Sequence, residues 1–519
     1  MLKKTVLLLL VMVSLAGCAR KPLSFVVLET TDLHGAYVTE FSGGSGYIRK
    51  LQQEYGDRLL LLDCGDNLHG TPEVYYSNFR DTVHTHIFSE YANWAGYSAL
   101  AVGNHDVEAG RNVYDRVYSK VNMPVLCANA VDSRTGEPYF QPYHFFTIKG
   151  CKIAVLGLLW PSAVDWISLD DMDNLTVEPM AASAEKWVKI IRETENPDVL
   201  IGLFHAGQEE TGEIAREIPG FDLICCGHAH NATELQEVSA AGDTVKIMEA
   251  GAKGSHVARA DITVTFVPGG KKPKVEVSTE LVAATNLPDY YEYDAPYEAF
   301  MHRLEQYMNF PVCVLKENVY SKDAMYGPSA WVDEIHQAVF DILNQYVPDL
   351  GVDVSFVSPA SRNLRVEKGV MTPREFITYY PYENKLVVMK MTGGEILRFL
   401  EYSYMLRLDH PEGPAYHFDS AAGIIYNVYR ERPYGKRVEI LSMADGRPFD
   451  TTATYHAAMT EFRSQGGGGH MVNGVGWNKQ TMQERMLWKS DKDMRQMLVL
   501  RASLSSPVNF KPLNQWRYL

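Results

Sequence analysis

The sequence has few cysteines and no excess of basic residues. Seven cysteines occur among 519 residues, and their spacing matches neither a zinc finger nor a Cys-x-x-Cys redox motif. We therefore expect the cysteines after residue 18 to be buried free thiols. The 49 basic and 64 acidic residues give a formal net charge of −15, which argues against a nucleic-acid polymer as partner, because polyanion binding relies on basic patches. A small anionic substrate stays open, since bound cations can reverse the local field.

Long apolar runs are also scarce, apart from one at the N-terminus that is short for a membrane-spanning helix. Lys3 and Lys4 precede the apolar run Val6 to Leu15, which is typical of a cleaved export signal. The following Leu15-Ala16-Gly17-Cys18 resembles the bacterial lipobox, in which the cysteine is lipidated. We expect residues 1–18 to be a lipoprotein signal peptide and Cys18 to anchor the protein to a membrane, on the periplasmic or cell-surface side of a bacterial envelope. A plain secretory signal is the alternative.

The length predicts two domains, and no internal repeat is present. From Ser24 to about Val267, apolar runs alternate with segments of helical period, which indicates an α/β domain. The predicted strands are Phe25–Leu28, Leu59–Leu62, Ala99–Val102, Val125–Ala128, Ile153–Leu158, Val199–Phe204, Leu223–Cys226 and Val245–Met248. The predicted helices are Ser45–Tyr55, Val83–Trp94, Ala182–Thr194 and Glu209–Ile218.

The second half of the chain again mixes helical and strand-like segments. Pro268 to Pro273 predicts a hairpin turn near the end of the first domain. Phe300, Leu304 and Met308 then recur with helical spacing. We expect a first domain over residues 24–285, a linker helix over 286–310 and a second domain over 311–519.

Candidate metal ligands follow five of the predicted strands. Mixed carboxylate, amide and imidazole donors suit zinc, manganese or iron, and strand ends are where α/β sheets form binding sites. Each residue alone is weak evidence, because a lone histidine after a strand is more often structural and an aspartate often caps a helix. Five such strand ends are expected to converge on one rim. The candidates are Asp32, His34, Asp66, Asn104, His205, His228 and His230.

The order Asp-x-His, Gly-Asp, Gly-Asn-His, His, Gly-His-x-His resembles the calcineurin-like metallophosphoesterases across the first domain. The resemblance implies an α/β fold with a four-layer sandwich and two divalent metal ions. It implies that Asp32, His34 and His230 hold one ion, that Asn104, His205 and His228 hold the other, and that Asp66 bridges them. Which of zinc, manganese or iron is bound does not follow from the sequence.

The resemblance also gives His105 and Glu108 catalytic roles. His105 would contact the transferring phosphoryl group or protonate the leaving oxygen, and Glu108 would orient its ring. Many relatives have aspartate at the position of Glu108. Two metal ions can neutralise phosphate charge and generate a hydroxide that attacks phosphorus, which makes the predicted reaction phosphoester hydrolysis.

The second domain resembles the C-terminal α/β domain of the 5′-nucleotidase and 2′,3′-cyclic-nucleotide 2′-phosphodiesterase family. The matching segments are Pro381–Asn384 and Thr460–Gly469. The resemblance implies that Tyr382 and Phe462 stack on the base, with Asn384 and Arg463 in the same substrate-binding motifs. The usual Asn-x-Gly-Gly-x-Arg is absent, and Ser358–Arg365 stands in its place, so Arg362 or Arg365 is the candidate substitute.

The sequence therefore predicts an exported, metal-dependent hydrolase acting on nucleotides. A 5′-nucleotidase and a 2′,3′-cyclic-nucleotide phosphodiesterase with 3′-nucleotidase activity stay open, the second favoured by Phe462-Arg463 before four glycines. The alternatives are a phosphatase for a non-nucleotide phosphoester and a lipoprotein that binds nucleotide or metal without turnover.

Overall fold

The computed structural model describes residues 20–38, 40–164, 167, 172–267, 272–290 and 297–519. The predicted signal peptide and Cys18 lie outside the described residues. The chain divides into two compact units, Met1–His302 and Arg303–Leu519. No helix in the described ranges is long and apolar enough to cross a membrane.

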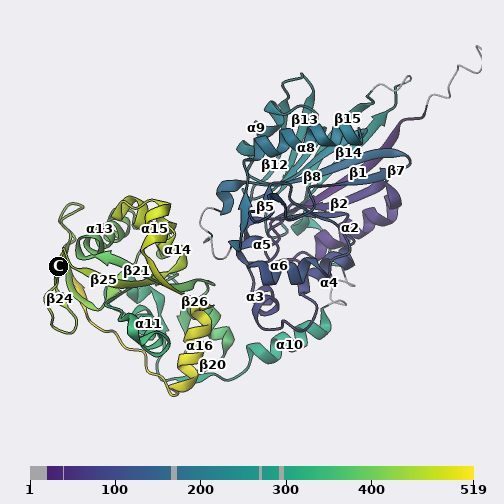
Figure 1. The fold of residues 1–519 in the computed structure, drawn as a ribbon. Helices are drawn as coiled ribbons and strands as arrows, with labels where there is room; N and C mark the ends of the chain where they lie inside the picture. The colour runs from purple at the N-terminus through teal and green to yellow at the C-terminus, as the bar shows by residue number, and fades with distance from the viewer. Residues whose placement is uncertain (1–19, 39, 165–166, 168–171, 268–271, 291–296) are drawn as a thin grey trace, which may run out of the picture. The chain divides into compact units, whose positions relative to one another are not determined.

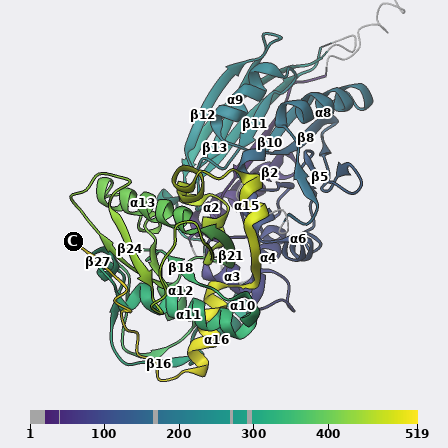
Figure 2. The ribbon, with the colours of Figure 1, turned by 60° about the vertical axis from the view of Figure 1, so that its left-hand side comes forward.

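The first unit contains two six-stranded sheets (Figures 1 and 2). One sheet has the order β15-β14-β1-β2-β3-β4, in which β1 to β4 run parallel and β14 and β15 form an antiparallel edge. Its strands are β1 (Leu23–Thr30), β2 (Leu59–Asp63), β3 (Ala99–Ala101), β4 (Val125–Leu126), β14 (His256–Thr265) and β15 (Lys274–Ala283). The β14–β15 pairing confirms the predicted hairpin, whose turn residues 268–271 are outside the described residues.

The second sheet has the order β12-β13-β11-β10-β8-β7. Strands β8, β10, β11 and β13 run parallel, with β7 and β12 antiparallel at the edges. The strands are β7 (Tyr143–Ile148), β8 (Cys151–Leu159), β10 (Val199–His205), β11 (Leu223–Cys226), β12 (Ala232–Val238) and β13 (Thr244–Ala250). All eight predicted strands of this unit are present, with bounds shifted by a few residues at most.

The two sheets pack face to face, and helices cover their outer faces. Alternate residues of β1 such as Phe25 and Val27 join residues of β10 such as Ile201 in a buried core between the sheets, as the two-residue period of a strand requires. Helices α8 (Met180–Thr194) and α9 (Gln208–Glu217) pack on the second sheet (Figure 2). Helix α2 (Ser42–Tyr55) packs on β1 and β2. The expected four-layer α/β sandwich is confirmed.

One detail of the prediction is wrong. The helix expected from Val83 begins at Ile87 as α4 (Ile87–Ala95), because the His86 side chain caps it and accepts the Phe88 N–H; Val83 is 90% exposed. The five ligand-bearing strand ends come from both sheets of the sandwich. β1, β2 and β3 belong to the first sheet, and β10 and β11 to the second.

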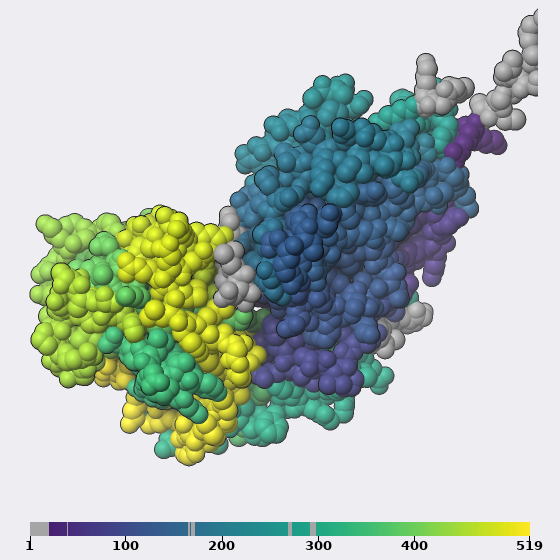
Figure 3. Space-filling model, viewed as in Figure 1, coloured from purple at the N-terminus to yellow at the C-terminus, as the bar shows by residue number. Residues whose placement is uncertain are grey.

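The second unit contains a five-stranded sheet with the order β22-β18-β25-β21-β26 and a smaller sheet, β24-β23-β27. The strands used below are β18 (Val354–Val357), β21 (Lys385–Thr392) and β25 (Thr454–Thr460), and the main helices are α11 (Ala330–Tyr346), α13 (Gly393–Asp409) and α16 (Met494–Leu504). Thr392 begins α13 with a capping box to Glu395. In Figure 3 the last, yellow part of the chain covers much of the visible face of this unit.

Candidate metal centre

Two clusters of metal-binding side chains form where the two sheets of the first unit present their strand ends. Asp32, His34 and His230 make one cluster, and Asp66, His205 and His228 make the other. Within each cluster, the donor atoms lie within 4.8 Å of one another. Both sets agree with the grouping implied by the sequence resemblance.

Asp66 and Asn104 complete the arrangement. Asp66 Oδ2 lies 3.3 Å from His205 Nε2 and 3.9 Å from His34 Nε2, so a single carboxylate oxygen faces both clusters. Asn104 Oδ1 lies 2.9 Å from His205 Nε2 and 2.9 Å from His228 Nδ1. The structure therefore brings all seven candidate ligands together.

Hydrogen bonds to backbone carbonyls orient two of the imidazoles. His34 Nδ1 lies 3.2 Å from the His69 carbonyl, and His205 Nδ1 lies 2.8 Å from the Cys64 carbonyl. Because a carbonyl only accepts, Nδ1 donates in both rings, so Nε2 is the nitrogen with the lone pair when the ring is neutral, and it faces the cluster. This tautomer is the one that binds a metal ion through Nε2.

The donor set fits divalent cations. Thr31 Oγ1 and His228 N donate to Asp32 Oδ2, whereas Asp32 Oδ1 is buried without a hydrogen-bond partner. Asp32 Oδ1 lies 3.2 Å from His230 Nε2, and His34 Nε2 lies 3.1 Å from His230 Nε2. An unsatisfied carboxylate oxygen that converges with two ring nitrogens is the arrangement a bound cation satisfies.

Local electrostatics favours the ligand forms of several groups. Burial lowers the pKa of both His34 and His228 to about 4, which leaves them neutral at pH 7. Burial opposes ionisation of Asp66, but the neighbouring His205 and His105 outweigh it and hold its pKa below the usual range. Burial likewise opposes protonation of His205, yet Asp66 raises its pKa to about 10. A proton on His205 thus competes with a cation for this imidazole.

The backbone at the centre is strained. Five of the six clustered residues have positive φ angles, a region that non-glycine residues rarely adopt: Asp32, His34, Asp66, His228 and His230, with φ between 47° and 80°. Backbone hydrogen bonds from Asp32 N to Gly65 O and from His34 N to Asp66 O hold the first two loops together. The surrounding fold thus imposes the conformation that directs the side chains inward.

The buried carboxylate of Asp106 organises the loops that carry Asp66 and Asn104. It accepts hydrogen bonds of 2.8 to 3.0 Å from four backbone N–H groups, those of Asp66, Asn67, Leu68 and Gly103. The four bonds make it a positioning residue for two ligand loops.

Replacing Asp106 by asparagine should destabilise the protein and weaken metal binding. One carboxylate oxygen becomes an amide donor facing backbone donors, so we expect the free energy of unfolding to fall by about 2–4 kcal/mol and metal affinity to fall about 10- to 100-fold. Chemical denaturation and metal titration measure both. The matched control is Asp57→Asn, since Asp57 is exposed and forms an ion pair with Lys149 on the surface. Equal behaviour of the two variants would contradict this role.

His105 and Glu108 lie beside the clusters. His105 Nδ1 and Glu108 Oε2 are 2.5 Å apart, and the His105 ring centroid is 5.3 Å from that of His34. Asp66 Oδ1 accepts the His105 N–H at 2.8 Å. Sequence reasoning missed His69, whose ring stacks on His105 at 4.7 Å and 15°; its position after Gly65-Asp66-Asn67-Leu68 was the available signal.

The second unit brings the two predicted stacking rings to one aromatic group. Tyr416, which no motif singled out, contacts Tyr382 at a centroid distance of 6.2 Å and Phe462 at 6.4 Å, both nearly perpendicular. The glycines allow close approach, because a Cβ at Gly467 would lie 2.5 Å from the Phe462 ring. The backbone carbonyl of half-buried Asn384 accepts the Met494 N–H.

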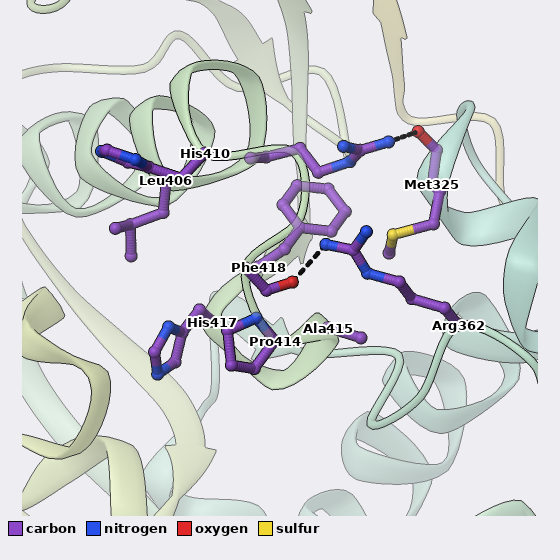
Figure 4. Close-up of a pocket in the computed structure, with 10 residues that line it drawn as sticks. Met325, Arg362, Leu406, His410, Pro414, Ala415, His417 and Phe418 are labelled. Carbon is purple, nitrogen blue, oxygen red and sulfur yellow. Dashed lines mark hydrogen bonds between the residues drawn. The ribbon is translucent and has the colours of Figure 1, made fainter.

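Three arginines of the second unit were expected at the substrate, and the structure shows the partners of each. Arg463 is 3% exposed and forms a two-bond ion pair with Asp419. Its other donors reach the carbonyls of Gly467 and Tyr416. Arg463 therefore holds the glycine segment in place, and its contact with the substrate stays a prediction. Arg362 donates to the Gly413 carbonyl and lines a small cavity (Figure 4), whereas Arg365 pairs with Glu367 on the surface.

Comparisons with known proteins agree with this architecture. Residues 25–232 match the calcineurin-like phosphoesterase family, and residues 314–474 match the 5′-nucleotidase C-terminal domain. A 5′-nucleotidase of Vibrio vulnificus is 24% identical over 76% of this chain and 80% of its own. A 2′,3′-cyclic-nucleotide 2′-phosphodiesterase/3′-nucleotidase of Yersinia enterocolitica is 22% identical over 85% of this chain and 80% of its own. The 5′-nucleotidase precursor of Thermus thermophilus shares the fold, with a TM-score of 0.60, 20% identity, and coverage of 96% of this chain and 99% of that one.

The fold, the donor set and these relatives define a metal-dependent phosphoester hydrolase. Calcineurin-like phosphoesterases use divalent metal ions, and the two clusters are the candidate sites for them. The chain belongs to the proteins that join a calcineurin-like phosphoesterase domain to a 5′-nucleotidase C-terminal domain.

Proposed function

We propose that this protein hydrolyses nucleotide phosphoesters at a two-metal centre formed by the Asp32 and Asp66 clusters. The observation that carries the proposal is the placement of Asp66 Oδ2, which faces His34 of one cluster and His205 of the other. When bound, a pair of divalent cations neutralises phosphate charge and lowers the pKa of a coordinated water. The residues that would hold the cations therefore also determine where the phosphate group of the substrate binds.

The chain's own residues supply the remaining steps of this proposal. His105 faces the clusters from the first turn of α5 (Asn104–Glu108), and Glu108 accepts its Nδ1–H. This hydrogen bond directs Nε2 toward the phosphoryl group, where it can contact an oxygen or give a proton to the leaving group. Buried Asp106 and the backbone bonds between the loops hold the geometry during turnover.

The nucleotide part of the proposal is supported by the relatives' names and by the aromatic group of the second unit. Phosphate release from AMP, 3′-AMP, 2′,3′-cyclic AMP and a sugar phosphate, with manganese or zinc, tests it directly. Preference for 5′-monophosphates identifies a 5′-nucleotidase, and preference for 2′,3′-cyclic and 3′-nucleotides identifies the phosphodiesterase branch. Preference for the sugar phosphate overturns the nucleotide assignment. If the metal-loaded protein releases phosphate from none of the four compounds, the proposed hydrolase activity is wrong.

Removing both predicted stacking rings should impair nucleotides selectively. Base stacking on an aromatic ring is worth about 1–3 kcal/mol. We therefore expect Tyr382→Ala with Phe462→Ala to raise KM for the preferred nucleotide about 10- to 100-fold, with little effect on p-nitrophenyl phosphate, which has no base. Steady-state kinetics on both substrates measures this. The matched control is Tyr434→Phe, since Tyr434 is 49% exposed in the same unit. Equal KM changes on both substrates would reject the base-stacking role.

We also propose that the protein is exported and anchored by lipid at Cys18, on the periplasmic or cell-surface side of a bacterial envelope. The support is the N-terminal pattern of Lys3 and Lys4, an apolar run and Leu15-Ala16-Gly17-Cys18. Radiolabelled palmitate should enter the wild type and be absent from Cys18→Ser, which should also leave the membrane fraction. Equal membrane association without label would exclude the lipid anchor.

A further inference from the structure

His69 lies in the loop that joins β2 to α3 (Pro72–Phe79), next to a ligand residue of the metal centre. The His69 carbonyl accepts the Nδ1–H of His34 at 3.2 Å, and the carbonyl of buried Leu68 accepts a side-chain N–H from α3 at 2.7 Å. A Cβ at Gly70 would lie 2.6 Å from the His34 carbonyl oxygen, so the loop packs closely on the His34 backbone. The fold therefore fixes the backbone on both sides of His69.

The side chain of His69 stacks on the ring of His105. The two ring centroids are 4.7 Å apart, and the ring planes differ by 15°. The ring of His34 contacts the ring of His105 at a centroid distance of 5.3 Å, with the two planes at 71°. Stacked and edge contacts are the two arrangements that aromatic pairs favour. The His105 ring therefore packs against one ring that is nearly parallel to it and one that is steeply inclined.

The stacked ring restrains a rotation that the hydrogen bond to Glu108 leaves free. The bond between His105 Nδ1 and Glu108 Oε2, 2.5 Å long, fixes one atom of the ring. The ring can still turn about this bond, because the last side-chain torsion of histidine has broad energy wells. Such a turn would break the face contact with His69. Stacking on His69 therefore sets the plane of the His105 ring and, with it, the direction of Nε2.

We propose, on the basis of the hydrolytic role proposed above for His105, that His69 is a positioning residue for His105. Its ring holds the His105 ring in the plane that directs Nε2 at the phosphoryl group. His69 belongs to neither ligand cluster, so its side chain acts on the His105 ring and not on a metal ion. The hydrogen bond from His34 goes to the backbone of His69 and is kept when the His69 side chain is replaced.

Steady-state kinetics of three variants of the metal-loaded, full-length protein test this role. We expect His69→Ala to lower kcat for p-nitrophenyl phosphate about 3- to 10-fold, which is the contribution of one aromatic pair expressed as a rate. KM and metal content should not change. His69→Leu fills the space without a flat face and should behave like His69→Ala. His69→Phe keeps the flat face and should retain at least about half of the wild-type kcat, because stacking is preserved.

A double-mutant cycle distinguishes positioning from an independent role of His69. His69→Ala should cause no further loss of kcat in the His105→Ala protein, because no ring is left to position. Multiplied losses in the double variant would overturn the proposal, as would equal losses in His69→Ala and His69→Phe. The matched control is His144→Ala, since His144 is half-buried in the same unit and contacts the Phe146 ring, outside both clusters. Its kcat should equal that of the wild type.

Nuclear magnetic resonance of the zinc-loaded protein, labelled at histidine, tests the stacking without any need for turnover. A ring stacked on His105 shifts the signals of the His105 ring protons upfield, and their loss in His105→Ala assigns them. We expect these signals to move downfield in His69→Ala and to stay near the wild-type position in His69→Phe. Unchanged signals or wild-type kcat in His69→Ala would overturn the positioning role. Wild-type protein without hydrolysis, or His105→Ala with wild-type kcat, would instead overturn the proposed function on which this role rests.

Discussion

Replacing Asp66 by asparagine should reduce phosphoester hydrolysis by about 10³-fold or more. Asp66 Oδ2 is the oxygen that faces both clusters, and its negative charge is what two cations close together require. A loss of about 4 kcal/mol in transition-state stabilisation corresponds to a thousandfold slower rate. The asparagine keeps the size of the side chain and can still accept the His105 N–H through Oδ1. The measurement is kcat/KM together with metal content per chain.

Metal content and the far-ultraviolet spectrum distinguish loss of the bridging carboxylate from misfolding of this variant. We expect Asp66→Asn to retain less than the full metal content of the wild type, with a far-ultraviolet spectrum that is unchanged. Asp57→Asn, the exposed control, should keep both metal content and rate. Wild-type activity in Asp66→Asn would show that the carboxylate does not bridge the clusters, and the two-metal proposal would then fail.

The ligand positions could be predicted from sequence because they follow strands. Asp32 follows β1 and His228 follows β11 by two residues, so apolar runs ending in polar donors were visible without coordinates. The sequence did not reveal that these strand ends come from two facing sheets, because periodicity reports burial and not which sheet a strand joins. The positive φ angles at five of the clustered residues were equally hidden, since they arise from bonds between loops such as His34 N to Asp66 O.

Contacts between residues far apart in the sequence account for the features of the second unit that were not predicted. Arg463 matched a substrate-binding segment. Its ion pair with Asp419, 44 residues earlier in the chain, could not be predicted from that segment. Tyr416 lies in no motif, and only the packing of its turn brings it to Tyr382, which lies between α12 (Pro373–Tyr379) and β21, and to Phe462, which lies just after β25. Local sequence patterns thus identified the residues that the strands bring together. They did not identify contacts that depend on how the connecting segments pack.

Replacing His105 by alanine should lower kcat by about 10²- to 10⁴-fold while both metal ions stay bound. His105 is absent from both ligand clusters, and its ring is instead held by Glu108 at 2.5 Å. The backbone N–H of residue 105 still donates to Asp66 Oδ1 in the variant, so the bridging carboxylate keeps this partner. The expected result is therefore a slow enzyme with full metal content, measured by single-turnover kinetics and elemental analysis.

His84 offers a matched control, because its Nδ1 lies 2.5 Å from Asp81 Oδ1 in the same unit but away from the clusters. His84→Ala should leave kcat unchanged, which shows that losing a histidine–carboxylate pair does not by itself slow the reaction. Glu108→Gln should slow the reaction less than His105→Ala, since glutamine can still accept the Nδ1–H through its amide oxygen. Loss of metal from His105→Ala would make His105 a ligand, and the division between groups that hold metal and a group that acts on phosphate would have to be redrawn.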